Sequence, residues 1–262
     1  GTPGEDIRVE AVWNEPFGLT GNGITVGVVD SGIQMDHEDL LRNLEPTLAC
    51  SFPSVAGNSV TILCDMTNPD DLYGHGTQVA GIIAAEANNS ETGVAGIAFN
   101  AKLANMAITT TGLDGWTDDI IGEAFSRFRD DVDIYNNSYG IATETGSPWL
   151  TQPGPLTLAA LQTTVAGVGG TAGRGGLGGI FVFSSGNDSD IDANPDPGPT
   201  DGKPDMRTDY RGLQSSRYTI NVGGVGHTGE RASYSDFGSS LFVTAYTGDE
   251  AEDGGIYGIS TT

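Results

Sequence analysis

Short apolar runs alternate with segments of helical spacing along this chain, and this alternation constrains the fold more than any other feature. Several of the runs are rich in β-branched residues and are bounded by turn formers, which is typical of buried parallel strands. They lie at residues 23–30, 101–108, 132–138, 178–186 and 218–225. The helical segments lie between them, at residues 76–88, 116–130 and 154–169. The pattern predicts an α/β fold with a mostly parallel, doubly wound central sheet.

The chain shows no internal repeat and no linker, so we expect its 262 residues to form one domain. A chain of this length buries about three quarters of its unfolded surface, so its core requires neither a metal nor a disulfide. The one low-complexity stretch, residues 188–205, is rich in Pro, Gly and Asp and is predicted to be a loop. No apolar run approaches membrane-spanning length.

The charge balance narrows the classes of partner. The chain has 35 acidic and 11 basic residues, which gives a net charge of −24. A surface of this charge repels phosphate backbones and anionic lipid, so neither nucleic acid nor a membrane is expected as a partner. The acidic residues are spread over loops. They fit either a solvated surface suited to a salty or calcium-rich medium, or specific calcium sites within such a surface.

Cys50 and Cys64 are the only cysteines of the chain, and a polar stretch that contains Gly and Ser separates them. A disulfide between them would close a short loop and add about 3 kcal/mol in the chain-entropy account. Two free buried thiols are the alternative. A disulfide would imply an oxidising, extracytoplasmic compartment.

Polar residues stand directly after the predicted strands, where the active crevice of an open α/β sheet lies. Asp30 ends the run VGVVD, and Asn187 follows Gly186 after the most apolar strand. His75 lies between two glycines at the start of a helix whose small residues allow close packing on the sheet. Each residue alone is also typical of a cap or a turn. Together they could orient a general base, move a proton and stabilise an oxyanion.

The motifs around these residues resemble the subtilisin-like serine proteases, and within them the kexin and furin type of proprotein convertase. The resemblance is carried, in chain order, by VVDSGIQMDHEDL, GHGTQVAGIIAAEANNSETGVAGIAFNAKL, NNSYG, GRGGLGGIFVFSSGN and RASYSDFGSSLFVTAYTG. It implies a three-layer, subtilisin-like peptidase domain over residues 1–262. The acid precedes the histidine in the chain, as it does in the triad order of subtilisin.

The resemblance implies acyl-transfer chemistry. Asp30 would orient the imidazole, His75 would act as general base and acid, and Asn187 would stabilise the tetrahedral oxyanion. A further set of residues matches the positions that bind the substrate backbone and wall the P1 side chain. These are Met106, Ala107, Ser138, Tyr139 and Gly140.

The resemblance also implies bound calcium, a hard cation that is held by oxygen ligands from loops. The positions that match a strong site are Asp6, Asp39, Glu86, Asn89, Glu91 and Gly93. A second site near the P1 side chain would draw on Glu144, Asp190, Asp192 and Asp236.

The sequence departs from the convertase pattern where those enzymes bind basic side chains. Residues 141–143 are Ile, Ala and Thr where charge is expected, and Leu72 and Tyr73 replace a polar, partly acidic pair. Asp209 is a candidate to bind a basic P1 side chain, but the full set of carboxylates is not found. We therefore expect cleavage that is not restricted to paired basic residues.

The Gly-Thr-Ser motif that carries the family's nucleophile does not occur in residues 1–262. Ser260 is the last serine of the sequence. No helical segment follows it, and it is predicted to lie in a strand. We therefore expect the nucleophile just beyond Thr262, on a C-terminal fragment of the same precursor that binds this chain and completes the domain.

The sequence favours a secreted, calcium-dependent serine endopeptidase that acts on polypeptides. The alternative is a non-catalytic, subtilase-like module that binds a peptide or a protein in the same groove, and the retention of Asp30, His75 and Asn187 argues against it. A metal hydrolase built on the Asp-His-Glu-Asp run at residues 36–39 is a weaker hypothesis, because adjacent residues on a turn point in diverging directions.

Overall fold

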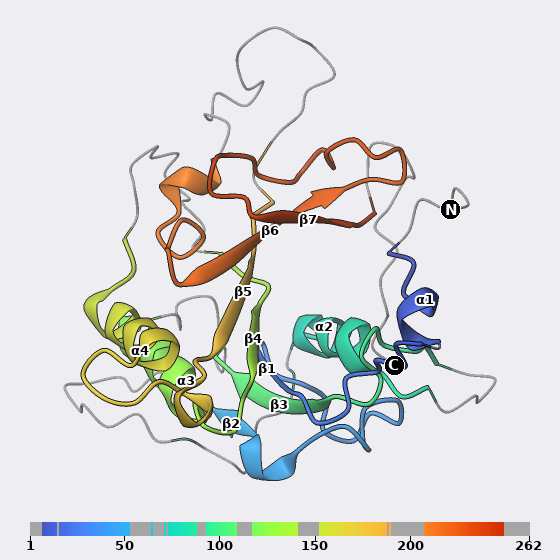
Figure 1. Ribbon diagram of the computed structural model, residues 1–262, viewed down its shortest axis with the longest axis horizontal. Coiled ribbons are helices and arrows are strands. Elements are labelled where there is room, and N and C mark those ends of the chain that lie inside the picture. The colour runs from blue at the N-terminus through green and yellow to red at the C-terminus, as the bar shows by residue number, and fades with distance from the viewer. Residues whose placement is uncertain are drawn as a thin grey trace, which may run out of the picture. The chain divides into compact units, whose positions relative to one another are not determined.

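Figure 1 shows the computed structural model of the protein. It describes residues 7–14, 16–52, 64, 71, 73–87, 93–108, 117–140, 152–187, 189 and 207–248. The chain divides into two compact units. The larger unit comprises Val9–Ser138, Gly154–Phe181 and Gly258–Thr262. The smaller unit comprises Gly1–Arg8, Tyr139–Pro153 and Val182–Tyr257.

Seven strands of the described chain form one sheet in the order β2-β3-β1-β4-β5-β6-β7. They are β1 (Thr25–Asp30), β2 (Cys50–Ser51), β3 (Lys102–Ala107), β4 (Ile134–Asn137), β5 (Ile180–Ser184), β6 (Thr219–Val225) and β7 (Val243–Tyr246). The pairs β1–β3, β1–β4, β2–β3 and β6–β7 are parallel. The predicted parallel α/β sheet is therefore confirmed, and each predicted apolar run contains a strand.

The described helices are α1 (Glu10–Trp13), α2 (His75–Ala84), α3 (Asp118–Ser126) and α4 (Pro155–Ala166). Short 3-10 turns lie at Pro46–Leu48, Arg174–Gly176 and Thr208–Tyr210. The three predicted helices are confirmed, although each ends earlier than predicted. α4, for example, stops where Gly167 takes a left-handed φ of 68° and its N–H bonds back to the last turn. None of these described helices could cross a membrane, because none is both long and apolar enough.

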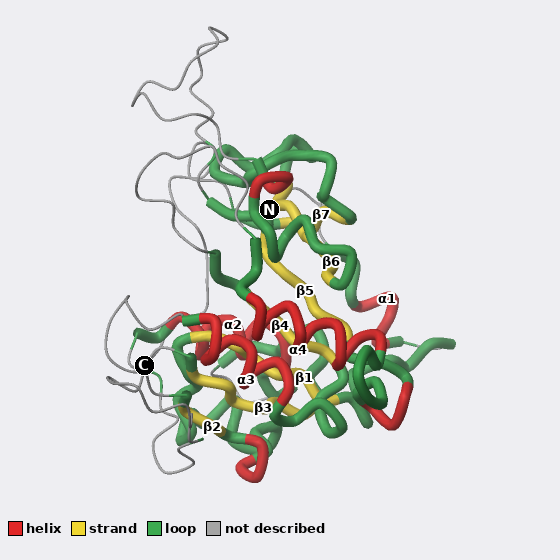
Figure 2. Tube along the Cα trace, turned by 90° about the vertical axis from the view of Figure 1, so that its left-hand side faces the viewer, coloured by secondary structure: helices red, strands yellow, loops and turns green. Residues whose placement is uncertain are grey.

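In the larger unit, helices cover both faces of the strands, so the expected three-layer arrangement is confirmed there. Val26 and Val28 of β1 join Ala80, Ala84 and Leu103 in one buried cluster. Figure 1 shows α2 beside β1, which it contacts. The alanines keep α2 narrow, which lets the helix pack close to the sheet. On the opposite face, α3 and α4 lie side by side in front of the strands (Figure 2).

Aromatic rings fill the space between α3 and the strands. The rings of Tyr135 on β4 and Phe181 on β5 stack with their centroids 4.3 Å apart, and Phe125 of α3 meets Phe181 edge-on at 4.8 Å. All three side chains are buried. The hydroxyl of Tyr135 has no hydrogen-bond partner among the described residues, and its burial raises the pKa of Tyr135.

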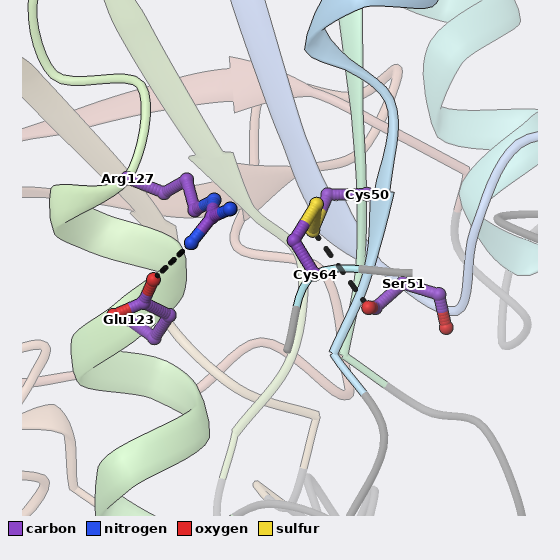
Figure 3. The surroundings of a disulfide bond; sticks show 5 residues. All are labelled: Cys50, Ser51, Cys64, Glu123 and Arg127. Atoms are coloured by element: carbon purple, nitrogen blue, oxygen red, sulfur yellow. Dashed lines mark hydrogen bonds and ion pairs between the residues drawn. A yellow bond between two sulfur atoms is a disulfide. The ribbon is translucent and has the colours of Figure 1, made fainter. Parts of the chain in front are cut away.

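A disulfide joins Cys50 to Cys64 in the larger unit, with Cα atoms 5.3 Å apart (Figure 3). Cys50 opens β2 and lies opposite Met106 of β3. The predicted disulfide is therefore confirmed, and the alternative of two free thiols is wrong. Figure 3 also shows the ion pair between Glu123 and Arg127 at the end of α3, where the two side chains are 2.9 Å apart.

The substitution Tyr135→Phe tests the unpaired hydroxyl. We expect the free energy of unfolding to rise by about 1 kcal/mol, because the change removes a buried polar group and keeps the stacked ring. The contrasting variant Phe181→Ala should lose about 3–5 kcal/mol through the cavity that it leaves. Equilibrium unfolding in urea measures both. A Tyr135→Phe protein that is less stable than the wild type would show that the hydroxyl makes a stabilising hydrogen bond.

Candidate active site

Asp30 and His75 meet where β1 ends and α2 begins. Asp30 is the last residue of β1 and His75 is the first residue of α2. Nδ1 of His75 lies 2.7 Å from Oδ1 of Asp30. The side chain of Asp30 is 4% exposed and that of His75 is 54% exposed. A buried acid therefore holds a ring that remains open to solvent.

The hydrogen bonds of Asp30 assign the proton on this ring. Oδ1 accepts the backbone N–H of Ser31 at 2.7 Å in addition to the His75 contact. An ionised carboxylate can only accept, so Nδ1 carries the proton and Nε2 is the basic nitrogen. Among the described residues, Asp30 is the only hydrogen-bond partner of the ring. The pair has the geometry of a general base and its orienting acid.

The glycines on either side of His75 have different roles. Gly74 is the N-cap of α2 and has a left-handed φ of 79°, which side-chain-bearing residues rarely adopt. A Cβ on Gly76 would overlap the carbonyl oxygen of Gly32, which follows β1. The first turn of α2 therefore lies directly against the chain that leaves β1. This agrees with the close packing of the helix on the sheet that the sequence predicts.

Asp71 anchors the start of α2 from outside the helix. Its Oδ2 accepts the N–H of Thr77 at 2.9 Å and the hydroxyl of Thr77 at 2.6 Å. Its Oδ1 accepts the N–H groups of Tyr73 and Gly74 at 3.0 and 2.8 Å, and the hydroxyl of Ser31 at 2.8 Å. Gly74 has no side chain with which to cap the helix, so this carboxylate satisfies donors of the first turn.

Ser31 connects this anchor to both members of the pair. Its hydroxyl donates to Asp71 and accepts the N–H of Gly76 at 3.0 Å. Because Ser31 directly follows Asp30, one network fixes the acid and the base. Asp71 was not among the site residues predicted from the sequence. The available signal was an acidic residue one helical turn ahead of His75, next to an N-cap glycine that cannot cap.

Asn187 lies just past β5 in the smaller unit and is exposed. The backbone that leads to it is fixed by two hydrogen bonds. The N–H of Ser185 donates to the carbonyl of Val222 at 2.9 Å, and the N–H of Asp236 donates to the carbonyl of Gly186 at 3.1 Å.

The residues expected to contact substrate lie at strand ends in both units. Met106 and Ala107 end β3 and are buried. Ser138 follows β4, and its hydroxyl accepts the side-chain amide of Asn136 at 2.9 Å. In the smaller unit, Tyr139 is buried with its ring edge-on to Phe183 at 6.1 Å.

The two described carboxylates of the smaller unit that were expected to bind cations are each paired with an arginine. Nη2 of Arg207 lies 2.6 Å from Oδ2 of Asp209, and Nε of Arg211 lies 2.9 Å from Oδ2 of Asp236. The Arg211–Asp236 pair is buried, whereas Arg207 is partly exposed.

The described residues of the first expected calcium site lie together. The N–H of Glu86 donates to the carbonyl of Asp39 at 2.8 Å, and a Cβ on Gly93 would overlap the Asp39 carboxylate. Oδ2 of Asp39 accepts the N–H of Val94 at 3.0 Å, and Oε1 of Glu86 accepts the N–H of Arg42 at 2.7 Å. The other expected metal ligands lie outside the described residues: Asp6, Asn89, Glu91, Glu144, Asp190 and Asp192.

The run at residues 36–39 forms local contacts. Nδ1 of His37 accepts the N–H of Asp39 at 3.2 Å, and Oδ1 of Asp36 accepts the side-chain amide of Gln34 at 2.9 Å. In the part of the chain that the structure describes, no group of three or more His, Cys, Asp or Glu side chains could hold a metal ion. The metal-hydrolase hypothesis therefore gains no support from these residues.

Comparison with known proteins agrees with this geometry. Residues 21–260 match the peptidase S8 family, which is described as the Subtilase family. The chain belongs to the subtilase family. This subtilase is 31% identical over 250 residues to the proprotein convertase subtilisin/kexin type 4 of Rattus norvegicus, covering 95% of this chain and 32% of the relative. It is 33% identical over 247 residues to neuroendocrine convertase 2 of Homo sapiens, covering 94% and 34%. The chain thus spans about a third of the length of these relatives.

Solved structures share the fold of this subtilase. A serine protease of Aeromonas sobria in complex with a chaperone matches with a TM-score of 0.63 at 25% identity, over 88% of this chain and 37% of that chain. MycP1 with its N-terminal propeptide removed matches with a TM-score of 0.53 at 18% identity, over 87% and 66%. The family and the subtilisin-like fold inferred from the sequence are therefore confirmed.

Two carboxylates act on the imidazole of this subtilase. The hydrogen bond to Asp30 has the largest effect and raises the pKa of His75. Burial lowers this pKa, and the negative charges of Asp30 and Asp71 raise it further. Burial alone would raise the pKa of Asp71, but hydrogen bonds from Thr77, Tyr73 and Ser31 hold it below its usual value of 3.8. Asp71 is therefore ionised at neutral pH and stabilises the imidazolium form of His75.

The substitution Asp71→Asn should lower the pKa of His75, because it removes a nearby negative charge and retains an oxygen acceptor. Proton release from His75 then occurs at lower pH, so the acidic limb of any pH–rate profile moves to lower pH. An NMR titration of the ring measures the shift. Asp36→Asn is the charge-matched control. An unchanged pKa of His75 in Asp71→Asn would contradict this role.

Proposed function

We propose that this subtilase domain is the acid–base half of a serine endopeptidase that works through an acyl-enzyme. The observation that carries the proposal is the 2.7 Å contact between the buried Asp30 carboxylate and Nδ1 of His75. It leaves Nε2 as the basic nitrogen on an open ring. Membership of the subtilase family and the similarity to convertases support the same chemistry.

In the proposed reaction, Nε2 of His75 removes the proton of a serine hydroxyl while the serine oxygen attacks the peptide carbonyl. Asp30 stabilises the imidazolium, and the amide of Asn187 donates to the oxyanion, a contact worth about 10²–10³ in kcat. His75 then passes the proton to the leaving amine, which breaks the C–N bond and leaves an acyl-enzyme. A water molecule, deprotonated by the same nitrogen, releases the acid.

We place the nucleophile on a serine outside residues 1–262. The sequence contains no Gly-Thr-Ser motif, and the chain spans only about a third of the convertases it resembles. The proposed partner is a segment of the same precursor that carries this serine. A secreted location is supported by the Cys50–Cys64 disulfide and by the net charge of −24.

A fluorophosphonate probe tests the nucleophile on the complete native protein. We expect the label on a serine outside residues 1–262, because only a serine beside Nε2 of His75 is activated. The variant His75→Ala should lose labelling, whereas Ser260→Ala should keep it. Mass spectrometry of the labelled peptides locates the site. A label on a serine within residues 1–262 would overturn the assignment, and no label on any serine would favour the peptide-binding module.

We further propose that calcium binds at Asp39, together with Asp6, Asn89 and backbone carbonyls of Glu86, Glu91 and Gly93. The chemistry of the described donors supports this, because a buried carboxylate lies against Gly93 and beside Glu86. Oxygen ligands of this kind suit a hard cation. Calcium at this position would connect the loop that follows α2 to the turn that contains Asp39, and would stabilise the fold.

Calcium should raise the melting temperature of the protein. A cation that binds only the folded state contributes about 2.7 kcal/mol at a hundredfold excess over its Kd. Calcium titration of metal-free protein, followed by chelation, measures the shift in Tm. Asp39→Asn should reduce that shift, whereas Asp36→Asn, which alters an exposed residue three positions away, should not. A melting temperature that is unchanged by calcium in the wild type would refute the site.

A further inference from the structure

The buried ion pair of the smaller unit bears on which substrates the proposed peptidase accepts. The side chain of Arg211 is 6% exposed and that of Asp236 is 0% exposed, and Nε donates to Oδ2 at 2.9 Å. Water cannot screen this pair, so the guanidinium and the carboxylate neutralise each other directly. Asp236 is therefore not an uncompensated negative charge that could attract a second cation.

Arg211 lies next to two glycines that matter for the proposed substrate site. A Cβ built on Gly140 would lie 2.8 Å from Nη1 of Arg211. A Cβ built on Gly186 would overlap Oδ2 of Asp236 and lie 3.1 Å from Cζ of Arg211. Gly140 belongs to the proposed wall of the P1 side chain, and Gly186 directly precedes Asn187. All of these residues belong to the smaller unit.

The remaining candidate acid for a basic P1 side chain is also occupied. Both oxygens of Asp209 have partners, because Oδ2 accepts from Arg207 at 2.6 Å and Oδ1 accepts from Ser239 at 2.9 Å and from the N–H of Ser240 at 3.0 Å. A lysine or arginine of a substrate would therefore have to displace an internal arginine before it could pair with either carboxylate.

We propose that Arg211 is a specificity-determining residue that makes this subtilase select an uncharged P1 side chain over lysine or arginine. The inference rests on the proposed function for the location of P1. A cationic P1 side chain would lie beside the buried guanidinium of Arg211, and neither Asp209 nor Asp236 would be available as its counter-ion, which costs at least about tenfold in affinity.

Peptide binding tests the proposal without any cleavage. The probes are acetyl-Ala-Ala-Pro-norleucine and acetyl-Ala-Ala-Pro-lysine, which share a four-carbon last side chain and differ only in the ammonium group at its end. Isothermal titration measures their Kd for the protein, and anilides of the same peptides measure kcat/KM. We expect the norleucine peptide to bind at least about tenfold more tightly than the lysine peptide. Equal binding, or tighter binding of lysine, would overturn the proposal.

The variant Arg211→Met should reverse the preference, because it removes the positive charge beside Gly140 and breaks the ion pair of Asp236, whose carboxylate then attracts the lysine of the peptide. Arg217→Met is the charge-matched control, since Arg217 lies over the ring of Tyr218 and should leave the ratio unchanged. An unchanged ratio in a folded Arg211→Met protein would also overturn the proposal. If that variant does not fold, the wild-type ratio still decides. Failure of fluorophosphonate labelling would overturn the catalytic proposal, whereas the ratio of the two Kd values tests only the role of Arg211.

Discussion

The close approach of α2 to the end of β1 is the constraint on which the candidate active site depends. Gly76 lies against the carbonyl of Gly32, so the first turn of the helix reaches the chain that has just left the sheet. At that distance Nδ1 of His75 meets Oδ1 of Asp30, and the hydroxyl of Ser31 meets the N–H of Gly76. A side chain at residue 76 would separate the helix from the strand, and with it the base from the acid.

The sequence is strongly acidic, and several of its few arginines form ion pairs with carboxylates. Only 11 basic residues accompany 35 acidic ones, yet several arginines pair with carboxylates inside the fold. Arg174 holds Oδ1 of Asp133 at 2.6 Å, while Oδ2 of Asp133 accepts the N–H of Thr25 at the start of β1. Among the described residues, Arg211 and Asp236 are buried and neutralise each other, whereas Arg174 and Asp133 form a part-buried pair.

The alternation of apolar runs and helical segments was sufficient to predict most of the sheet. Buried parallel strands such as β1 and β3 are apolar on both faces, so their sequences carry a strong local signal. β2 has two residues, too few for a periodic pattern, and β7 is exposed along its whole length. Their pairing depends on neighbours that come from distant parts of the chain, which a local pattern cannot reveal.

The sequence by itself determined the family, the class of fold and the identity of the residues that form the acid–base pair, because Asp30 and His75 stand within long local motifs. It also indicated the Cys50–Cys64 disulfide. Only the tertiary structure decided the environment of the charges. Asp133 pairs with Arg174, 41 residues away, and Asp236 pairs with Arg211, 25 residues away. A carboxylate has the same local sequence whether it is free to bind a ligand or is neutralised, because its partner is brought to it by the fold.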